Sequence, residues 1–167
     1  TFRFLSSKLS FSRFWAGRPS GLTIEFTADM FFAVDDMVVV ILPAFETEAG
    51  PRECSDFESS PPEAVSYAAW ETEPNVGGAD SCRCPGCICK NAVVLKLTRY
   101  FAEETVLSIS LSHTCGIKLP FEGLEANETS LMLRVFGAAG DIPPTSFTYS
   151  DPVGTIALTG KLFFNPP

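Results

Sequence analysis

Four of the six cysteines lie within eight residues, in the segment Cys82-Arg-Cys84-Pro-Gly-Cys87-Ile-Cys89. A thiolate cluster of this density could hold a metal. Structural zinc sites, however, usually combine two ligand pairs that lie far apart in the sequence, whereas the intervals in this segment are one, two and one residues. A redox-active pair at Cys84 and Cys87 would need a thiol with a lowered pKa, often at a helix N-terminus. The neighbouring sequence predicts strands, which argues against that chemistry.

Disulfide bonds are the favoured use of these thiols. Pro85-Gly86 has the residues of a type II turn, which would place Cys84 opposite Cys87 and Cys82 opposite Cys89 on one face of a hairpin. Six cysteines allow 15 pairings. The preferred arrangement lets each of the two remaining cysteines reach into this cluster, with one bridge left inside it. All six cysteines are therefore predicted to form disulfides: Cys54, Cys82, Cys84, Cys87, Cys89 and Cys115.

The chain lacks the residues from which an active site is usually built. His113 is the only histidine, which excludes a site with two histidine ligands, and adjacent Ser112 would point to the other face of a strand. The acidic residues of 46–58 and the pair at 35–36 lack the ordered spacing of a calcium loop, which favours solvated loops over a metal site. No phosphate-binding loop or nucleophile elbow is present. We therefore expect no enzyme, no catalytic residue, no metal and no cofactor.

Exposed aromatic residues would indicate a binding surface instead. Trp15, Tyr67, Trp70 and Tyr100 could form a platform on which sugars stack, although such residues pack in cores by default. The pair Phe31-Phe32 falls in a loop between predicted strands and could contact a neighbouring subunit. A secreted carbohydrate-binding or adhesion module is therefore the alternative function.

Several features indicate a secreted or cell-surface protein. Cysteine-rich chains are typical of oxidising compartments, and Asn127-Glu128-Thr129 is an acceptor sequence for N-linked glycans. The Pro-Ser/Thr clusters at 59–62 and 143–146 could carry O-linked glycans or could be plain loops. The chain begins at Thr1, which we interpret as removal of a leader or as a segment of a longer polypeptide.

The composition of the chain argues against two classes of partner, nucleic acids and membranes. The net charge of −8 provides no basic surface for nucleic acid or for an anionic membrane, and no apolar run approaches the ~20 residues of a membrane span. Hydrophobic residues make up 46% of the chain and charged residues 19%, enough apolar material for one core. We expect a single domain over residues 1–167.

The apolar residues recur with period two. Leu22, Ile24 and Phe26 alternate with polar residues, and the apolar residues of 107–111 alternate with serines, as in strands with one buried face. Val93, Leu95 and Leu97 share one face opposite Lys96 and Thr98, and Leu131, Leu133 and Val135 alternate with Met132, Arg134 and Phe136. The unbroken apolar run 37–42 predicts a central strand covered on both sides. A last strand is expected from Ile156 to Phe164.

Gly and Pro interrupt these segments at short intervals, and no convincing helix is found. Residues 64–71 could form a short helix, but Val65, Tyr67 and Ala69 alternate equally well as a strand. Seven to nine short strands predict an all-β antiparallel sandwich of immunoglobulin-like type. Residues 46–90 are expected to be a long acidic, cysteine-rich insertion.

The two ends of the chain resemble each other. Residues 4–11 (FLSSKLSF) align without gaps with residues 157–164 (ALTGKLFF). Either two edge strands share an amphipathic pattern, or the strand 1–11 is exchanged with a neighbouring subunit. In the second case its removal should leave a folded domain that no longer assembles. The residues assigned to assembly are Phe4, Leu5, Leu9, Phe11, Leu158, Leu162 and Phe164.

Most of the chain resembles a known class of repeats. Residues 21–27 (GLTIEFT) and 35–45 (DDMVVVILPAF) look like the paired TITFT and GD-I-I-LPGF strands of tandem immunoglobulin-like β-sandwich repeats. Those repeats occur in very large secreted or cell-surface proteins of algae and other protists. Four later segments are similar to the rest of that repeat: residues 116–120, 123–127, 152–154 and 162–166. The cysteine-rich segment departs from the pattern. The resemblance implies a tandem or polymeric extracellular module without an active site.

Together these observations predict an extracellular structural glycoprotein, the subunit of a fibril or surface layer joined by head-to-tail strand contacts. Its partners would be copies of itself or adjacent modules, together with covalently attached glycans.

Overall fold

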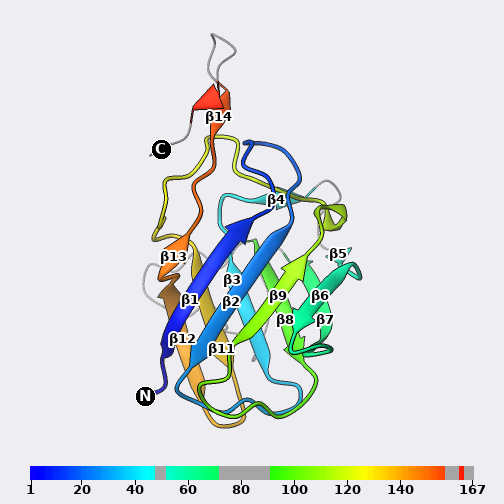
Figure 1. Cartoon of the computed structure of the whole chain (residues 1–167), viewed down its shortest axis with the longest axis vertical. Helices are drawn as coiled ribbons and strands as arrows, with labels where there is room; N and C mark the ends of the chain where they lie inside the picture. The colour runs from blue at the N-terminus through cyan, green and yellow to red at the C-terminus, as the bar shows by residue number, and fades with distance from the viewer. Residues whose placement is uncertain (48–51, 72–90, 157–161, 164–167) are drawn as a thin grey trace.

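The computed structural model, which describes residues 1–47, 52–71, 91–156 and 162–163, is a sandwich of two β-sheets (Figure 1). The five-stranded sheet has the order β13 (Tyr149–Ser150), β1 (Phe4–Phe11), β2 (Leu22–Ala28), β9 (Leu107–Leu111) and β6 (Phe57–Ser60). The six-stranded sheet has the order β12 (Asp141–Ser146), β11 (Met132–Phe136), β3 (Met37–Ile41), β8 (Ala92–Leu97), β7 (Val65–Glu71) and β5 (Arg52–Glu53). Their strands pair antiparallel, except that β1 and β13 are parallel. The predicted all-β antiparallel class is confirmed, whereas the immunoglobulin-like type stays a prediction.

Smaller elements lie at the end of the sandwich opposite the N-terminus (Figure 1). β4 (Glu46–Thr47) pairs with β10 (Ile117–Lys118), and a 3-10 turn, η1 (His113–Cys115), precedes β10. β14 (Thr155–Ile156) and β15 (Leu162–Phe163) form an antiparallel pair in which Ile156 lies opposite Leu162. The expected single strand from Ile156 to Phe164 is therefore wrong, because Ile156 and Leu162 belong to two strands of opposite direction. Leu158 and Phe164 lie outside the described residues.

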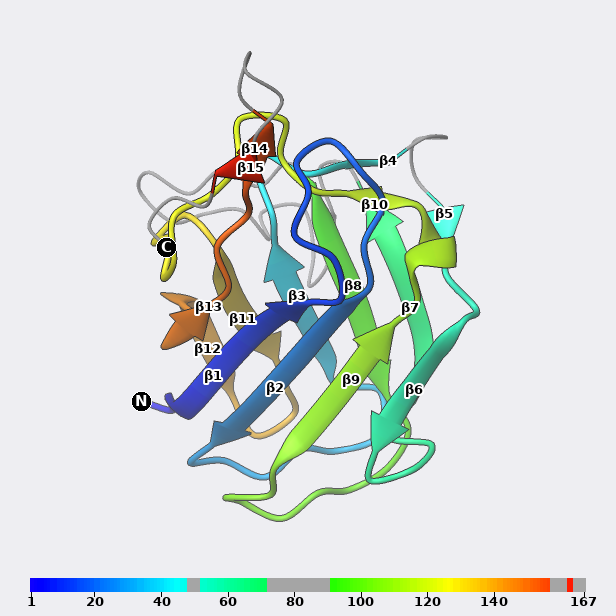
Figure 2. The same ribbon diagram turned by 45° about the horizontal axis from the view of Figure 1, so that its top comes forward.

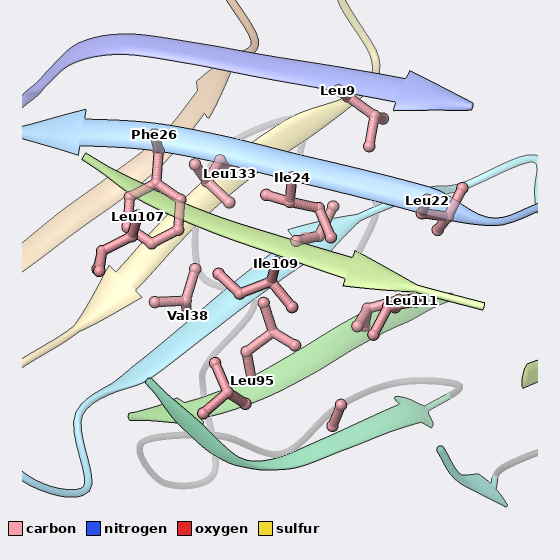
Figure 3. Packing of buried hydrophobic residues seen from close by; sticks show 14 of the residues in the cluster. Leu9, Leu22, Ile24, Phe26, Val38, Leu95, Leu107, Ile109, Leu111 and Leu133 are labelled. Carbon is pink, nitrogen blue, oxygen red and sulfur yellow. The ribbon is translucent and has the colours of Figure 1, made fainter. Parts of the chain in front are cut away.

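Alternation along the strands builds the core between the two sheets. Leu22, Ile24 and Phe26 of β2 point inward and are almost completely buried, as predicted, and they face Val38, Leu95 and Leu133 of the other sheet (Figure 3). The Phe26 ring meets the rings of Phe4 and Phe32 edge to face, at centroid distances of 6.0 and 5.9 Å. Edge-to-face contacts of this kind add about 0.5–1.5 kcal/mol beyond the burial of area.

The central strand β3 is buried on both of its faces, as its apolar sequence predicts. Val38 and Val40 belong to the core between the sheets, and Val39 and Ile41 form a second buried cluster on the outer face with Ala92 and Val94 of β8. Strands buried on both sides lack the polar alternation of half-exposed strands.

Strand β7 confirms the strand interpretation of residues 64–71 but not its predicted face. A bulge between Val65 and Tyr67 shifts the register against β8, so the alternation resumes with opposite phase. Val65, Ala68 and Trp70 therefore belong to the core, whereas Tyr67 is only partly buried.

The segment 46–90 is not an insertion throughout, in contrast to expectation. Its residues 52–71 supply β5, β6 and β7 to the two sheets, and Ala64, Val65, Ala68 and Trp70 are part of the core. The sequence does not indicate β5 and β6, because these strands have only 2 and 4 residues and lie among polar and proline residues. The cysteines at 82–89 lie outside the described residues.

The β12 edge of the six-stranded sheet is unfavourable for pairing with a further strand. Pro143 and Pro144, expected in a loop, lie within the edge strand β12. Proline has no N–H to donate to a ladder, and natural sheets use it on edges to prevent pairing with other chains. Growth of the sheet by strand addition is therefore disfavoured at β12.

Candidate functional site

The described cysteines form one bridge, between Cys54 and Cys115, with a Cα–Cα distance of 5.2 Å. The expectation that each would reach into the 82–89 cluster is therefore wrong. β6 and β9 are adjacent, with Phe57 opposite Leu111, and this pairing brings together the segments that precede β6 and follow β9. Because the two cysteines are 61 residues apart in the sequence, this bridge cannot be recognised before the strand pairing is known.

Asp56 joins the same two segments beside the bridge. Thr114 Oγ1 donates a hydrogen bond of 2.6 Å to Asp56 Oδ2, and Ser112 N donates to the Asp56 carbonyl at 2.9 Å. Hydrogen bonds from the Thr114 and Ser112 hydroxyls lower the pKa of the Asp56 carboxyl. Asp56 therefore links the two segments that the bridge also joins, and His113 lies exposed within η1.

Asn127, the predicted glycosylation residue, lies on an exposed turn. Its backbone is left-handed, with φ 59°, a conformation that asparagine tolerates better than most residues. Its Oδ1 accepts a hydrogen bond of 3.1 Å from Ser150 N. The contact uses the side-chain oxygen and not the amide nitrogen, the atom to which an N-linked glycan would be attached.

The N-terminal strand is part of the domain's own sheet. Leu9 and Phe11 of β1 are buried in the core, Phe4 packs against it, and Leu5 is exposed. The outer side of β1 is bonded to residues 148–151: Asp151 N donates to the Leu9 carbonyl at 3.0 Å, and Phe11 N donates to Asp151 Oδ2 at 3.0 Å. Of the C-terminal residues assigned to assembly, only Leu162 falls in a described strand, β15.

The predicted sugar platform does not form. Trp70 is buried in the core, Trp15 lies on the β1–β2 loop and Tyr100 lies on the β8–β9 loop. These loops are at opposite ends of the sandwich (Figure 1). No group of three or more His, Cys, Asp or Glu side chains in the described ranges is arranged to hold a metal ion.

Exposed large hydrophobic side chains gather instead at the two ends of the sandwich. Phe31, Val34, Tyr100 and Val106 lie on the loops at the N-terminal end, Phe14, Trp15 and Phe121 lie at the opposite end, and Leu5 and Tyr149 lie along the β1–β13 edge. Clusters of exposed apolar residues mark surfaces that contact other molecules. These two clusters, one at each end of the sandwich, are the candidate functional site. The sequence assigned Phe31 to a subunit contact, Leu5 to assembly, and Trp15 and Tyr100 to a sugar platform, but it did not place them at two opposite ends.

We call residues 12–18 the arginine loop. Gly154 N donates to the Phe14 carbonyl at 2.8 Å, Ala16 N donates to the Gly154 carbonyl at 3.0 Å, and Gly17 N donates to the Leu119 carbonyl at 3.0 Å. Figure 2 shows this loop at the end of the molecule that carries β14 and β15. The bonds on both sides fix the loop in one conformation.

The arginine loop presents an aromatic surface flanked by positive charge. Trp15 is 53% exposed, and residues Ser12, Arg13, Phe14, Trp15 and Arg18 line a hollow of about 630 Å³. Gly17, with φ +72°, lies against the Phe121 ring, where a Cβ would stand only 3.0 Å from a ring carbon. Phe121, itself 87% exposed, is thereby held next to the loop.

We call the loops 29–36 and 98–106 together the acidic end. Phe32 and Phe101 exchange two backbone hydrogen bonds, of 2.8 and 3.0 Å, which tie the loops together. The rings of Phe31 and Tyr100 lie above this bridge at a centroid distance of 5.7 Å, and Tyr100 is 62% exposed. Three aspartates in 29–36, and two glutamates against one arginine in 98–106, give a net charge of −3 − 1 = −4.

Asp36 is a buried carboxylate that holds the acidic end to the neighbouring loop 137–140. It is 4% exposed; its Oδ2 accepts from Ala33 N at 2.8 Å and its Oδ1 from Ala138 N at 3.0 Å. Asp36→Asn would place an amide donor opposite one of these N–H groups. We expect a loss of about 1.5–3 kcal/mol in the free energy of unfolding, because hydrogen bonds to charged groups are worth this much.

Asp35→Asn is the matched control for this prediction in urea unfolding. Asp35 is exposed, and among the described residues its carboxylate pairs with Lys96, at 3.5 Å. Exposed ion pairs contribute about 0–1 kcal/mol, so the control should unfold close to the wild type. Equal stability of the Asp35 and Asp36 variants would contradict the assigned role of Asp36.

The fold and site define the chain as an all-β, two-sheet, disulfide-linked domain with a cluster of exposed aromatic residues at each end. No family model matches the chain, and no curated protein or solved structure matches it significantly. No helix in the described part is long and apolar enough to cross a membrane.

Proposed function

We propose that the chain is a structural module of an extracellular fibril or surface layer, in which copies or adjacent modules join end to end. The observation that carries this proposal is that the clusters of exposed aromatic residues lie at the two ends of the long axis, where the N-terminus and the last described strands also lie. The N-terminus and the β14–β15 pair lie at opposite ends of the long axis (Figure 1), and each end has its own cluster of exposed apolar residues. Such a domain can be repeated along a line without rearrangement.

An oxidising, extracellular setting is supported by two features. The Cys54–Cys115 bridge is of a kind that persists outside the cytosol, and the exposed Asn127 turn offers an acceptor for an N-linked glycan. Attached glycans would face water from the side of the module and leave its ends free.

Sedimentation velocity of the full, oxidised chain tests the proposal. We expect the sedimentation coefficient to rise with protein concentration in a ladder of species, because end-to-end contacts do not close on themselves. A single monomeric species up to the solubility limit would contradict the proposal.

The alternative function, carbohydrate binding, is favoured by one observation. Trp15 is exposed in a hollow between Arg13 and Arg18, and aromatic and arginine side chains suit an acidic sugar. This function predicts binding of dextran sulfate by the monomer and loss of binding in Trp15→Ala.

A further inference from the structure

The two ends of the module carry unpaired charges of opposite sign. Arg13 and Arg18 are exposed, and their guanidinium groups have no ion pair among the described residues. Glu103 and Glu104 at the acidic end are likewise exposed and unpaired in that part of the chain. Of the other charges at the acidic end, Asp29 contacts Arg3 at 3.6 Å and Asp35 contacts Lys96 at 3.5 Å, Asp36 is buried, and the Arg99 guanidinium lies over the Phe101 ring.

We infer that the arginine loop of one copy docks on the acidic end of the next copy. This inference rests on the proposed function and names the contact that joins the modules. Trp15 and Phe121 would meet Phe31 and Tyr100 in the centre of the interface, and the arginines would meet Glu103 and Glu104 around it.

The composition of both surfaces fits such an interface. Aromatic residues and arginine are enriched in protein interfaces, with apolar residues at the centre and a polar, solvated rim. The arginine loop contains two arginines and no acidic residue, whereas the acidic end keeps a net charge of −4 + 2 = −2 once the paired cations Arg3 and Lys96 are counted. Opposite potentials of this kind set the register and the partner more than they set the affinity.

Rigidity on both sides favours docking without reorganisation. The arginine loop is bonded to Gly154 and Leu119, and the two loops of the acidic end are bonded to each other through Phe32 and Phe101. Preformed surfaces lose less conformational entropy on association.

The geometry favours a second copy over another partner. Two different surfaces at opposite ends of one molecule form a heterologous contact, which repeats indefinitely unless a rotation closes it into a ring. Both complementary surfaces are present on every copy, so no other component is needed. Lateral strand addition is disfavoured at β12 by its two prolines.

Charge reversal at each end provides the test, with self-association of the full oxidised chain measured by sedimentation velocity. The variants Arg13→Glu/Arg18→Glu and Glu103→Arg/Glu104→Arg would each bring like charges together. We expect either variant alone to associate at least about 100-fold more weakly than the wild type, because like-charge juxtaposition costs several kcal/mol.

Combining the two charge-reversed variants distinguishes loss of this specific contact from a general effect of the changed net charge. An equimolar mixture of the two variants should associate again, because each end then finds an opposite charge on the other variant. The variant with all four exchanges should associate with itself, and it keeps the wild-type net charge of −8 − 4 + 4 = −8.

Glu25→Arg/Glu58→Arg is the matched control for the acidic end. Both glutamates are exposed and face outward from the five-stranded sheet, so two Glu→Arg exchanges change the net charge by the same amount away from the ends. This control should associate as the wild type does. Circular dichroism of every variant checks that the fold is kept.

The outcomes distinguish the inference from the proposed function. If the wild type assembles and the charge variants assemble equally well, or if the mixture fails to recover, the inference is overturned while the proposed function stands. A wild type that stays monomeric overturns both. Monomers that bind dextran sulfate through Arg13 and Arg18 would instead assign the arginine loop to an acidic glycan.

Discussion

Removal of residues 1–11 is expected to leave the isolated chain unfolded, and this is the largest effect that the structure predicts. The deletion takes Leu9 and Phe11 out of the core and exposes the edge of β2. Truncating a buried Leu or Phe to Ala costs about 2–5 kcal/mol each, and the deletion removes both with their strand. A loss of this size is comparable to the whole stability of a domain, about 5–15 kcal/mol.

Near-ultraviolet circular dichroism and urea titration would measure this effect. Deletion of residues 1–3 is the matched control, because it removes the Arg3–Asp29 contact but keeps β1. A truncated chain that still unfolds cooperatively would contradict the assigned role of β1. If the strand 1–11 were exchanged with a neighbouring subunit, the truncated domain would stay folded; the structure instead pairs β1 with β2 of the same chain.

A synthetic peptide of residues 1–11 extends the same experiment. Added to the truncated chain, it should restore the fold by occupying the place of β1, whereas a peptide with Leu9→Asp should not, because an unpaired charge would be buried. Recovery would show that the sheet accepts this strand from another molecule. That result would keep strand exchange as a second route to assembly.

Loss of the Cys54–Cys115 bridge is the second large effect. The bridge closes a loop with a sequence separation of 61 residues, for which restriction of the unfolded chain corresponds to about 4 kcal/mol at 25 °C. The variant Cys54→Ala/Cys115→Ala should therefore lose roughly this much free energy of unfolding in urea.

The double replacement is preferred to chemical reduction, because a reductant would act on every disulfide in the chain. A comparison with Asp56→Asn separates the bridge from its surroundings, since that replacement weakens the hydrogen bond from Thr114 but leaves the sulfurs in place. A change of less than about 1 kcal/mol on loss of the bridge would show that its contribution to stability has been overestimated.

The strands and the fold class could be predicted from the sequence because burial follows local alternation. Leu22, Ile24 and Phe26 identify β2 without any knowledge of its neighbours, and the apolar run from Met37 identifies β3 as central. Each pattern depends on residues close together in the chain, and such patterns are the strongest signals in a single sequence.

The predictions from the sequence fail where a contact between residues far apart in the chain determines the structure. The bulge before Tyr67 reverses the phase of β7, and only pairing with β8 shows it. The Cys54–Cys115 bridge depends on the adjacent positions of β6 and β9, and the division of the last strand depends on the antiparallel pairing of Ile156 with Leu162.

The candidate site was largely hidden for a related reason. The sequence does not distinguish the two tryptophans, yet Trp15 is exposed at one end of the sandwich and Trp70 is buried in the core. Phe31 and Tyr100 lie in different loops, and the backbone bridge between Phe32 and Phe101 brings them together. Loop residues carry no periodicity, so the sequence does not show which of them share a surface.

Cryo-electron microscopy of the full, oxidised chain at an assembling concentration tests the central claim most directly. The account predicts linear arrays with an axial repeat of one module, about 40–50 Å for strands of ordinary length with loops at both ends. The arginine loop of each module should face the acidic end of the next. Dispersed single particles, or arrays joined through the sheet edges, would contradict it.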